Sequence, residues 1–224
     1  MTMLDVTLGN LLDIQAERYS DYEAVVYPFE GIRWTYSEFK DRVDRIALGM
    51  VQMGIKKGDH VSIWATNVPE WVLTQFATAR IGAVLVTVNT NYKTFELEYL
   101  LKQSDTSTLI MTDGFKDSNY IEIINELCPE LKETQPGKLE SARFPCLKNI
   151  IYIGEDRYDG MFNFDDLYQK GENGDPIILD RIQEDLSPQD VINMQYTSGT
   201  TGFPKGVMLT HYNITNNGNA IADC

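Results

Sequence analysis

The sequence is short of the residues that build disulfide frameworks and zinc sites. Its 224 residues include three cysteines, Cys128, Cys146 and Cys224, with no CxxC pair, and only two histidines, His60 and His211. Because structural zinc sites need closely spaced Cys and His ligands, and disulfide-rich folds need several paired cysteines, neither class is indicated. We therefore expect an ordinary apolar core and a reducing, cytoplasmic compartment.

Long apolar runs and positive charge are also scarce. The strongest apolar run, IGAVLVTV at 81–88, is far too short to cross a bilayer, and the N-terminal MTMLDVTLGN lacks the basic and apolar regions of a secretory signal. Lys and Arg number 19 against 33 Asp and Glu, which gives a net charge of −14. The electrostatic field of this negative net charge repels nucleic acid and anionic membranes. A phosphate-bearing ligand therefore has to be held by local backbone amides and a few well-placed cations.

Two helices have recognisable beginnings. The first spans 35–53, because Thr35 and Glu38 have the spacing of a capping box and apolar residues recur every three or four positions. The charged residues of this helix lie on the side opposite the apolar face: Lys40, Asp41, Asp44 and Arg45. A second helix begins just after Asn67, the expected cap, and carries Trp71 into the core.

Short runs rich in β-branched residues separate the helices, at 61–65, 83–88, 107–111 and 149–153. Apolar strands that alternate with helices of about ten to fifteen residues predict an α/β fold, with layered parallel-type sheets flanked by helices. The runs 24–27 and 32–36 predict an N-terminal hairpin instead.

The composition of the sequence changes between 154 and 190, where Gly, Asp, Asn and Pro residues typical of turns divide the chain into short segments. This pattern predicts a surface excursion or a subdomain boundary. We therefore divide the chain into an N-terminal α/β subdomain, 1–186, and the start of a second subdomain, 187–224. The second part contains two candidate strands, 191–196 and 205–211, and a helix that begins at Asn213.

The loop between these two strands has the composition of a phosphate-binding site. Residues 197–206, TSGTTGFPKG, hold three glycines, three threonines, one serine and one lysine. Glycines allow several backbone N–H groups to turn inward around an oxyanion, hydroxyls bind phosphate or magnesium, and Lys205 adds a cation. The spacing is not that of a Walker A loop, and a strand rather than a helix follows, which argues against a P-loop kinase or GTPase. A polar hairpin loop without function has the same composition.

The full string YTSGTTGFPKGVMLTH, 196–211, resembles the signature of the adenylate-forming superfamily, which includes acyl-CoA synthetases, luciferases and the adenylation domains of peptide synthetases. LTQFATARIGAVLVTVN and VNTNYKTFELEYLLKQSD resemble further segments of that family. ELCPELKETQPGKLESARFPCLKNII and LTHYNITNN look like its medium-chain fatty acyl-CoA synthetase branch. The resemblance covers nearly the whole chain, as the N-terminal part of the family's large domain.

The resemblance implies a two-step ligase reaction. A fatty acid carboxylate attacks the α-phosphate of Mg²⁺-bound ATP to give acyl-AMP and pyrophosphate, and CoA then displaces AMP to give the thioester. The family's loop holds the β- and γ-phosphates, which implies cofactor-binding roles for these residues: Thr197, Ser198, Gly199, Thr200, Thr201, Gly202 and Lys205. Of these, Lys205 and Thr200 are the implied catalytic residues, and Thr197 is the implied magnesium ligand. His211 also matches a family position, but a lone histidine at the end of a strand is more often structural.

The family's adenine and ribose contacts, hinge and mobile domain would lie beyond this loop, so we expect an N-terminal portion that makes no acyl-AMP alone. An uncovered sheet edge then makes a homodimer an expectation as well. Two alternatives stay open: a relative that adenylates an aryl or amino acid, and a non-catalytic nucleotide-binding module.

Overall fold

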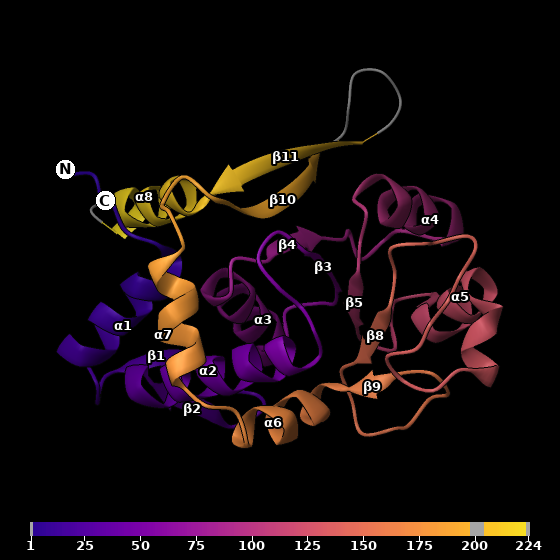
Figure 1. The fold of residues 1–224 in the computed structure, drawn as a ribbon, viewed down its shortest axis with the longest axis horizontal. Helices are drawn as coiled ribbons and strands as arrows, with labels where there is room; N and C mark the ends of the chain where they lie inside the picture. The colour runs from indigo at the N-terminus through magenta and orange to yellow at the C-terminus, as the bar shows by residue number, and fades with distance from the viewer. Residues whose placement is uncertain (1, 198–203, 223–224) are drawn as a thin grey trace.

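A seven-stranded sheet forms the centre of the computed structural model, which describes residues 2–197 and 204–222 (Figure 1). Its strands run in the order β11-β10-β4-β3-β5-β8-β9. All neighbours pair in parallel except β10 and β11, which are antiparallel. The bounds are β3 His60–Trp64, β4 Val84–Thr87, β5 Thr108–Met111, β8 Asn149–Tyr152, β9 Phe162–Asn163, β10 Val191–Thr197 and β11 Lys205–Thr210. The four predicted central strands and the α/β class are confirmed.

Helices cover both faces of this sheet. The helices are α1 Leu8–Arg18, α2 Tyr36–Gln52, α3 Pro69–Arg80, α4 Thr94–Gln103, α5 Tyr120–Leu127, α6 Phe164–Glu172, α7 Ile177–Glu184 and α8 His211–Ala222, with a 3₁₀ turn at Pro129–Glu133. In β3, Val61 and Ile63 join the core cluster beneath α2, α3 and α6, whereas Trp64 joins the cluster beneath α4 and α5. Because helices cover both faces, the central strands are buried on both faces and carry few polar residues. None of the helices in the described ranges is long and apolar enough to cross a membrane.

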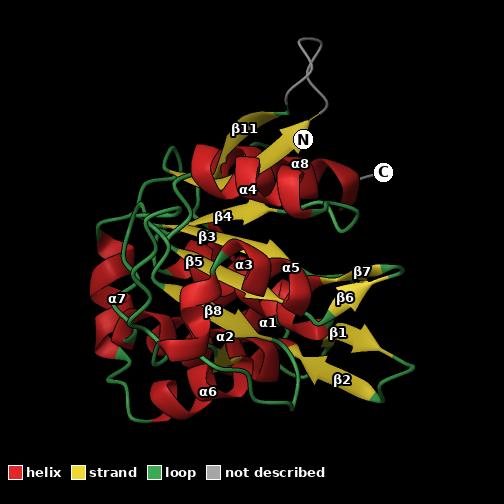
Figure 2. Ribbon diagram, turned by 90° about the vertical axis from the view of Figure 1, so that its right-hand side faces the viewer, coloured by secondary structure: helices red, strands yellow, loops and turns green. Residues whose placement is uncertain are grey.

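Two small hairpins lie beside the main sheet. The predicted N-terminal hairpin is confirmed as β1 Glu23–Tyr27 paired with β2 Ile32–Thr35, and a second hairpin joins β6 Gly114–Phe115 to β7 Ser118–Asn119. Figure 2 shows both hairpins on the side towards which the arrowheads of β3 and β4 point. They therefore border the carboxyl ends of the parallel strands.

The capping box at the start of α2 is confirmed, but the expected cap of α3 is wrong. Thr35 accepts from the Glu38 N–H at 3.2 Å, and Glu38 accepts from the Thr35 N–H at 2.9 Å. In α3 the N-cap residue is Val68, and the exposed Asn67 side chain instead accepts from the Tyr27 hydroxyl at 3.3 Å. Pro69 at the first helical position has no N–H to be capped, which removes part of the need for a polar cap. Trp71 is half-buried against the core.

The segment 154–190 is not the surface excursion that its turn residues predict. It contributes β9 to the main sheet and two helices, α6 and α7, which pack against α2. Phe164, Leu167 and Leu179 are buried in the core cluster beneath them. These helices are short, so few apolar repeats stand out between the Gly, Asp and Pro residues that separate them.

The last described helix begins two residues before the predicted start at Asn213. Thr210 precedes the first helical residue, His211, and its hydroxyl accepts from the Asn213 N–H at 3.2 Å. The Asn213 side chain in turn accepts from the Thr210 N–H at 3.0 Å. Asn213 is thus the partner in a reciprocal cap rather than the cap itself. The subdomain boundary near 186 stays a prediction, although β10 hydrogen-bonds directly to β4 in the same sheet.

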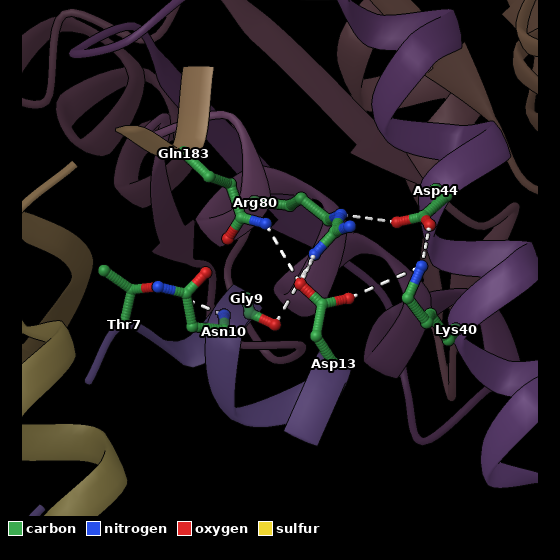
Figure 3. A network of polar contacts seen from close by, with 8 residues as sticks. All are labelled: Thr7, Gly9, Asn10, Asp13, Lys40, Asp44, Arg80 and Gln183. Carbon is green, nitrogen blue, oxygen red and sulfur yellow. Dashed lines mark hydrogen bonds and ion pairs between the residues drawn. The ribbon is translucent and has the colours of Figure 1, made fainter. Parts of the chain in front are cut away.

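A polar network around a buried arginine joins four helices (Figure 3). Arg80, at the end of α3, is 3% exposed and donates to Asp13 of α1 at 2.8 Å, and it forms a second ion pair with Asp44 of α2. Lys40 of α2 contacts both carboxylates, and Gln183 of α7 donates to Asp13 at 3.2 Å. The Lys40 and Asp44 side chains are therefore half-buried in a polar network rather than fully solvated.

Candidate functional site

The predicted phosphate loop is carried by an antiparallel hairpin. Strand β10 ends at Thr197 and β11 begins at Lys205, and these two residues are cross-strand partners. The expected strand, loop, strand order is confirmed. The intervening predicted residues lie outside the described part of the chain: Ser198, Gly199, Thr200, Thr201 and Gly202. The structure thus brings Thr197 and Lys205 together and says nothing of the other site residues.

The base of the loop lies at the carboxyl edge of the parallel strands. Because β10 runs parallel to β4, with Gln195 opposite Thr87, the loop leaves the sheet on the same edge as the segments that follow β3, β4 and β5. In open α/β sheets, ligands bind at the carboxyl ends of the strands. They do so especially at the point where the strand order reverses, so that successive strands are added on opposite sides of an earlier strand. Here β4 lies on one side of β3 and β5 on the other. The loop therefore begins at the edge that this rule assigns to the ligand.

Thr197 and Lys205 are both available to a ligand. Each is exposed at the base of the hairpin. Their strands are held close together by Gly206, where an added Cβ would lie 2.9 Å from the Met194 sulfur and 3.3 Å from the Tyr196 ring. A side chain at this position would have to displace the flexible Met194 side chain and press against the Tyr196 ring, so close approach favours glycine here. This packing places the hydroxyl-bearing residue and the cation at the two ends of one loop.

Helix α4 contacts β10 and the residue that directly precedes β11, which sequence reasoning missed. The Tyr99 hydroxyl donates to the carbonyl of Pro204 at 3.4 Å, and the Tyr196 hydroxyl donates to the side-chain carbonyl of Gln103. Tyr99 and Gln103 lie four residues apart, which is the spacing of two side chains on one helix face. That spacing was visible in the sequence, but nothing in the sequence placed α4 beside the hairpin.

A neutral hollow opens at the same edge of the sheet. It has a volume of about 510 Å³, and among the described residues that line it none is charged: Ala65, Thr66, Asn67, Trp71, Thr90 and Phe115. These residues follow β3, β4 and β5. The middle strand of the three, β3, lies two strands from β10, which is roughly 10 Å at the usual strand spacing. Its size is within the usual range of small-molecule pockets.

His211 has the structural role that its isolation predicts. It is fully buried, and its Nδ1 atom accepts a hydrogen bond from the backbone N–H of Leu8 at 3.0 Å. This contact ties the first residue of α1 to the first residue of α8. Burial lowers the pKa of His211 from 6.5 to about 4, with Asp190 opposing the shift and Lys57 adding to it. The ring is therefore neutral near pH 7, as the accepting nitrogen requires.

We expect His211 to make the free energy of unfolding depend on pH. The folded protein holds His211 neutral, whereas the unfolded chain protonates it below about pH 6.5. Its contribution to the free energy of unfolding is therefore complete above pH 6.5 and is lost as the pH falls to about 4. The shift corresponds to about 3 kcal/mol at 1.36 kcal/mol per pKa unit. His211→Asn keeps an acceptor for Leu8 but does not titrate.

The check is denaturant unfolding of both proteins from pH 7.5 to pH 4. The stability advantage of wild type over His211→Asn should shrink by about 3 kcal/mol across that range. Comparing the two proteins cancels the shared titration of Asp13 and Asp44. A difference that stays constant with pH contradicts the assigned role.

The described residues contain no group of three or more His, Cys, Asp or Glu side chains placed to hold a metal ion. Magnesium does not require one, because it is bound by one or two protein oxygens together with water and phosphate oxygens. The exposed hydroxyl of Thr197 at the loop base fits that requirement.

Burial raises the pKa of the Cys128 thiol to about 12, so this cysteine is an inert core residue.

Comparison with known families agrees with this geometry. A family model described as AMP-binding enzyme matches residues 12–224. The chain belongs to the AMP-binding enzyme family. The resemblance drawn from the loop string is thereby confirmed.

Curated relatives in the AMP-binding family cover nearly all of this chain. YngI of Bacillus subtilis (strain 168), provisionally named an acyl-CoA synthetase, is 52% identical over 222 residues, which is 99% of this chain and 40% of YngI. The medium-chain acyl-CoA ligase ACSF2 of Bos taurus, named as mitochondrial, is 42% identical over 216 residues, 96% of this chain and 35% of ACSF2. The chain thus spans 35 to 40% of the length of these relatives.

Solved structures show the same fold. The long-chain-fatty-acid–CoA ligase FadD1 of Archaeoglobus fulgidus superposes with a TM-score of 0.72 at 26% identity, covering 99% of this chain and 40% of FadD1. The anthranilate CoA ligase AuaEII, solved with anthranoyl-AMP, gives 0.73 at 21% identity, covering 94% and 36%. At that identity AuaEII supports the fold alone, and it is an enzyme that holds an acyl-adenylate.

Proposed function

We propose that this chain forms the phosphate-binding part of an ATP-dependent fatty acid:CoA ligase, which makes acyl-AMP and then acyl-CoA. Membership of the AMP-binding enzyme family supports this, as do the names of the relatives. The observation that carries it is the hairpin, which pairs Thr197 with Lys205 at the carboxyl edge of the sheet. A polar loop without function has no need for a cation and a hydroxyl at its two ends.

The first chemical step needs positioning more than acid–base catalysis. A fatty acid, with a pKa close to that of a Glu side chain at about 4.3, is ionised near neutrality and attacks without a general base. The difficulty is that two anions must meet in a chain of charge −14. Lys205 supplies positive charge at the loop, and the backbone and hydroxyl donors of the 197–202 segment would hold the departing pyrophosphate. Thr197 would hold magnesium, which would supply further positive charge against the phosphates.

The roles of the individual loop residues belong to this proposal. Thr197, Lys205 and the loop residues between them would bind the β- and γ-phosphates of ATP. Lys205 and Thr200 would act on the reacting phosphates, and Thr197 would contribute an oxygen to magnesium. CoA enters as the second substrate, after the adenylate has formed.

The proposal also covers the compartment and the assembly of the protein. The absence of Cys pairing in the sequence fits a reducing compartment such as the cytoplasm. Strand β11 is the edge strand of the main sheet as described, and Val207 and Met208 on it are 43% and 63% exposed. A homodimer that covers this edge would give twice the monomer mass in light scattering; a clean monomer would contradict it.

The substrate class is tested with the natural full-length protein. Pyrophosphate release should be measured with octanoate, palmitate, benzoate and a mixture of amino acids, each with Mg²⁺ and ATP. We expect the highest rate with octanoate, because ACSF2 is named a medium-chain ligase. Release with benzoate or amino acids alone would favour the aryl or amino acid alternative, and no release with any acid would favour a non-catalytic module.

A further inference from the structure

Helix α4 is itself firmly held, so it offers a fixed support to the hairpin. Its inner face is buried in the core through Leu97, Leu100 and Leu101. On its outer side, Glu98 accepts two hydrogen bonds from Arg143, at 2.8 and 2.6 Å, and one from Lys102 at 2.6 Å. These donors lower the pKa of Glu98 to about 2. The helix is thus anchored to the core and to the segment that leads into β8.

The contacts between α4 and the hairpin reach both ends of the loop. Pro204, whose carbonyl accepts from Tyr99, directly precedes β11. Tyr196, which donates to Gln103, is the next-to-last residue of β10. Burial raises the pKa of Tyr196 to about 12, so its hydroxyl keeps the proton that it donates. One helix face therefore contacts the strand that enters the loop and the residue that directly precedes the strand that leaves it.

We propose that Tyr99 and Gln103 are positioning residues for adenylation. Through Pro204 and Tyr196 they hold the two ends of the phosphate loop at a fixed place on the edge of the sheet, so that Lys205 and Thr197 stay paired as the phosphates react. The inference rests on the proposed function of the loop. In this proposal neither residue binds substrate, and each acts by pre-organising the residues that do.

The expected effect is on turnover rather than on substrate affinity. Contacts with the phosphates strengthen as pyrophosphate departs, so loosening the loop removes stabilisation that is made mainly in the transition state. A misplacement of about 1 Å costs on the order of 100-fold in rate. Losing one of two anchoring hydrogen bonds should cost less, on the order of 10-fold.

The experiment compares Gln103→Met, Gln103→Glu and Tyr99→Phe in the natural full-length protein. Gln103→Met keeps the length of the side chain but removes the acceptor for Tyr196, whereas Gln103→Glu keeps an acceptor. Tyr22→Phe is the matched control, since it removes a hydroxyl from a tyrosine that is 69% exposed and precedes β1. The readout is acid-dependent exchange of pyrophosphate into ATP. Gln103→Met and Tyr99→Phe should lower kcat about 10-fold with little change in KM, and Gln103→Glu and Tyr22→Phe should match wild type.

A second readout does not depend on catalysis. Hydrogen–deuterium exchange of the peptide 204–210, without any ligand, should be about 10-fold faster in Gln103→Met and Tyr99→Phe than in wild type and Tyr22→Phe. Unchanged exchange in both variants overturns the anchoring role, whatever the activity. Faster exchange with unchanged kcat overturns the catalytic consequence. Faster exchange in a protein inactive with every acid would leave the anchoring intact and remove the proposed function.

Discussion

Lys205→Met should lower the rate of acid-dependent adenylation about 100-fold while leaving the protein folded. Removing one donor that faces a developing charge costs 10² to 10³ in kcat, and Lys205 is the cation at the loop in a chain that is otherwise strongly acidic. Because the side chain is exposed, its loss should shift the thermal midpoint by no more than about 2 °C. The measurement is pyrophosphate exchange by the natural full-length protein, together with thermal unfolding.

The control for this prediction is Lys138→Met, which removes another exposed lysine, from the loop before β8. It makes the same change in net charge, so any general effect of charge on ATP affinity appears in both variants. Lys205→Arg should recover part of the rate, because it restores the charge but not the compact geometry of an ammonium group. Equal rates in Lys205→Met and Lys138→Met would mean that the hairpin does not serve phosphate chemistry.

The fold was largely predictable from sequence because its central strands are buried on both faces. Strands β5 and β8, which lie within the predicted runs 107–111 and 149–153, are buried at every position, and the capping box at Thr35 marks the start of α2 directly. Helices α6 and α7 were missed because a short helix bounded by turn residues shows few apolar repeats. The wrong predictions thus concern segments whose apolar pattern is too short to predict a helix and whose structure depends on packing against α2.

The candidate site was predictable only in part. The loop string located Thr197 and Lys205, and the strand on each side of it was readable. The support from Tyr99 and Gln103 was not, because contacts between residues 93 or more positions apart depend on which elements the sheet order brings together. The same reason hid the network around Arg80, which pairs with Asp13 of α1 and Asp44 of α2 and reaches α7 only through the contact of Asp13 with Gln183.

Arg80→Met should destabilise the protein by about 3 kcal/mol at pH 7, because it removes the more deeply buried of the two cations that Asp13 and Asp44 share. Burial acts to raise the pKa of Asp13, but the hydrogen bond from Arg80 and the charges of Arg80 and Lys40 outweigh it and hold that pKa below its usual value. Burial dominates at Asp44, whose pKa is raised even with Arg80 present. Without Arg80, Lys40 alone faces both carboxylates.

The pH dependence separates this electrostatic cause from lost packing. Asp13 and Asp44 would then take up protons more readily in the folded state than before, so the stability cost of Arg80→Met should shrink between pH 7 and pH 4. A defect in packing alone would lower the free energy of unfolding by the same amount at pH 7 and at pH 4. Arg157→Met is the matched control, since Arg157 pairs with Asp166 but is 61% exposed, and it should cost less than about 1 kcal/mol. Denaturant unfolding of both variants at the two pH values decides the matter, and equal costs for Arg80→Met and Arg157→Met would show that the buried network contributes no more than a surface ion pair.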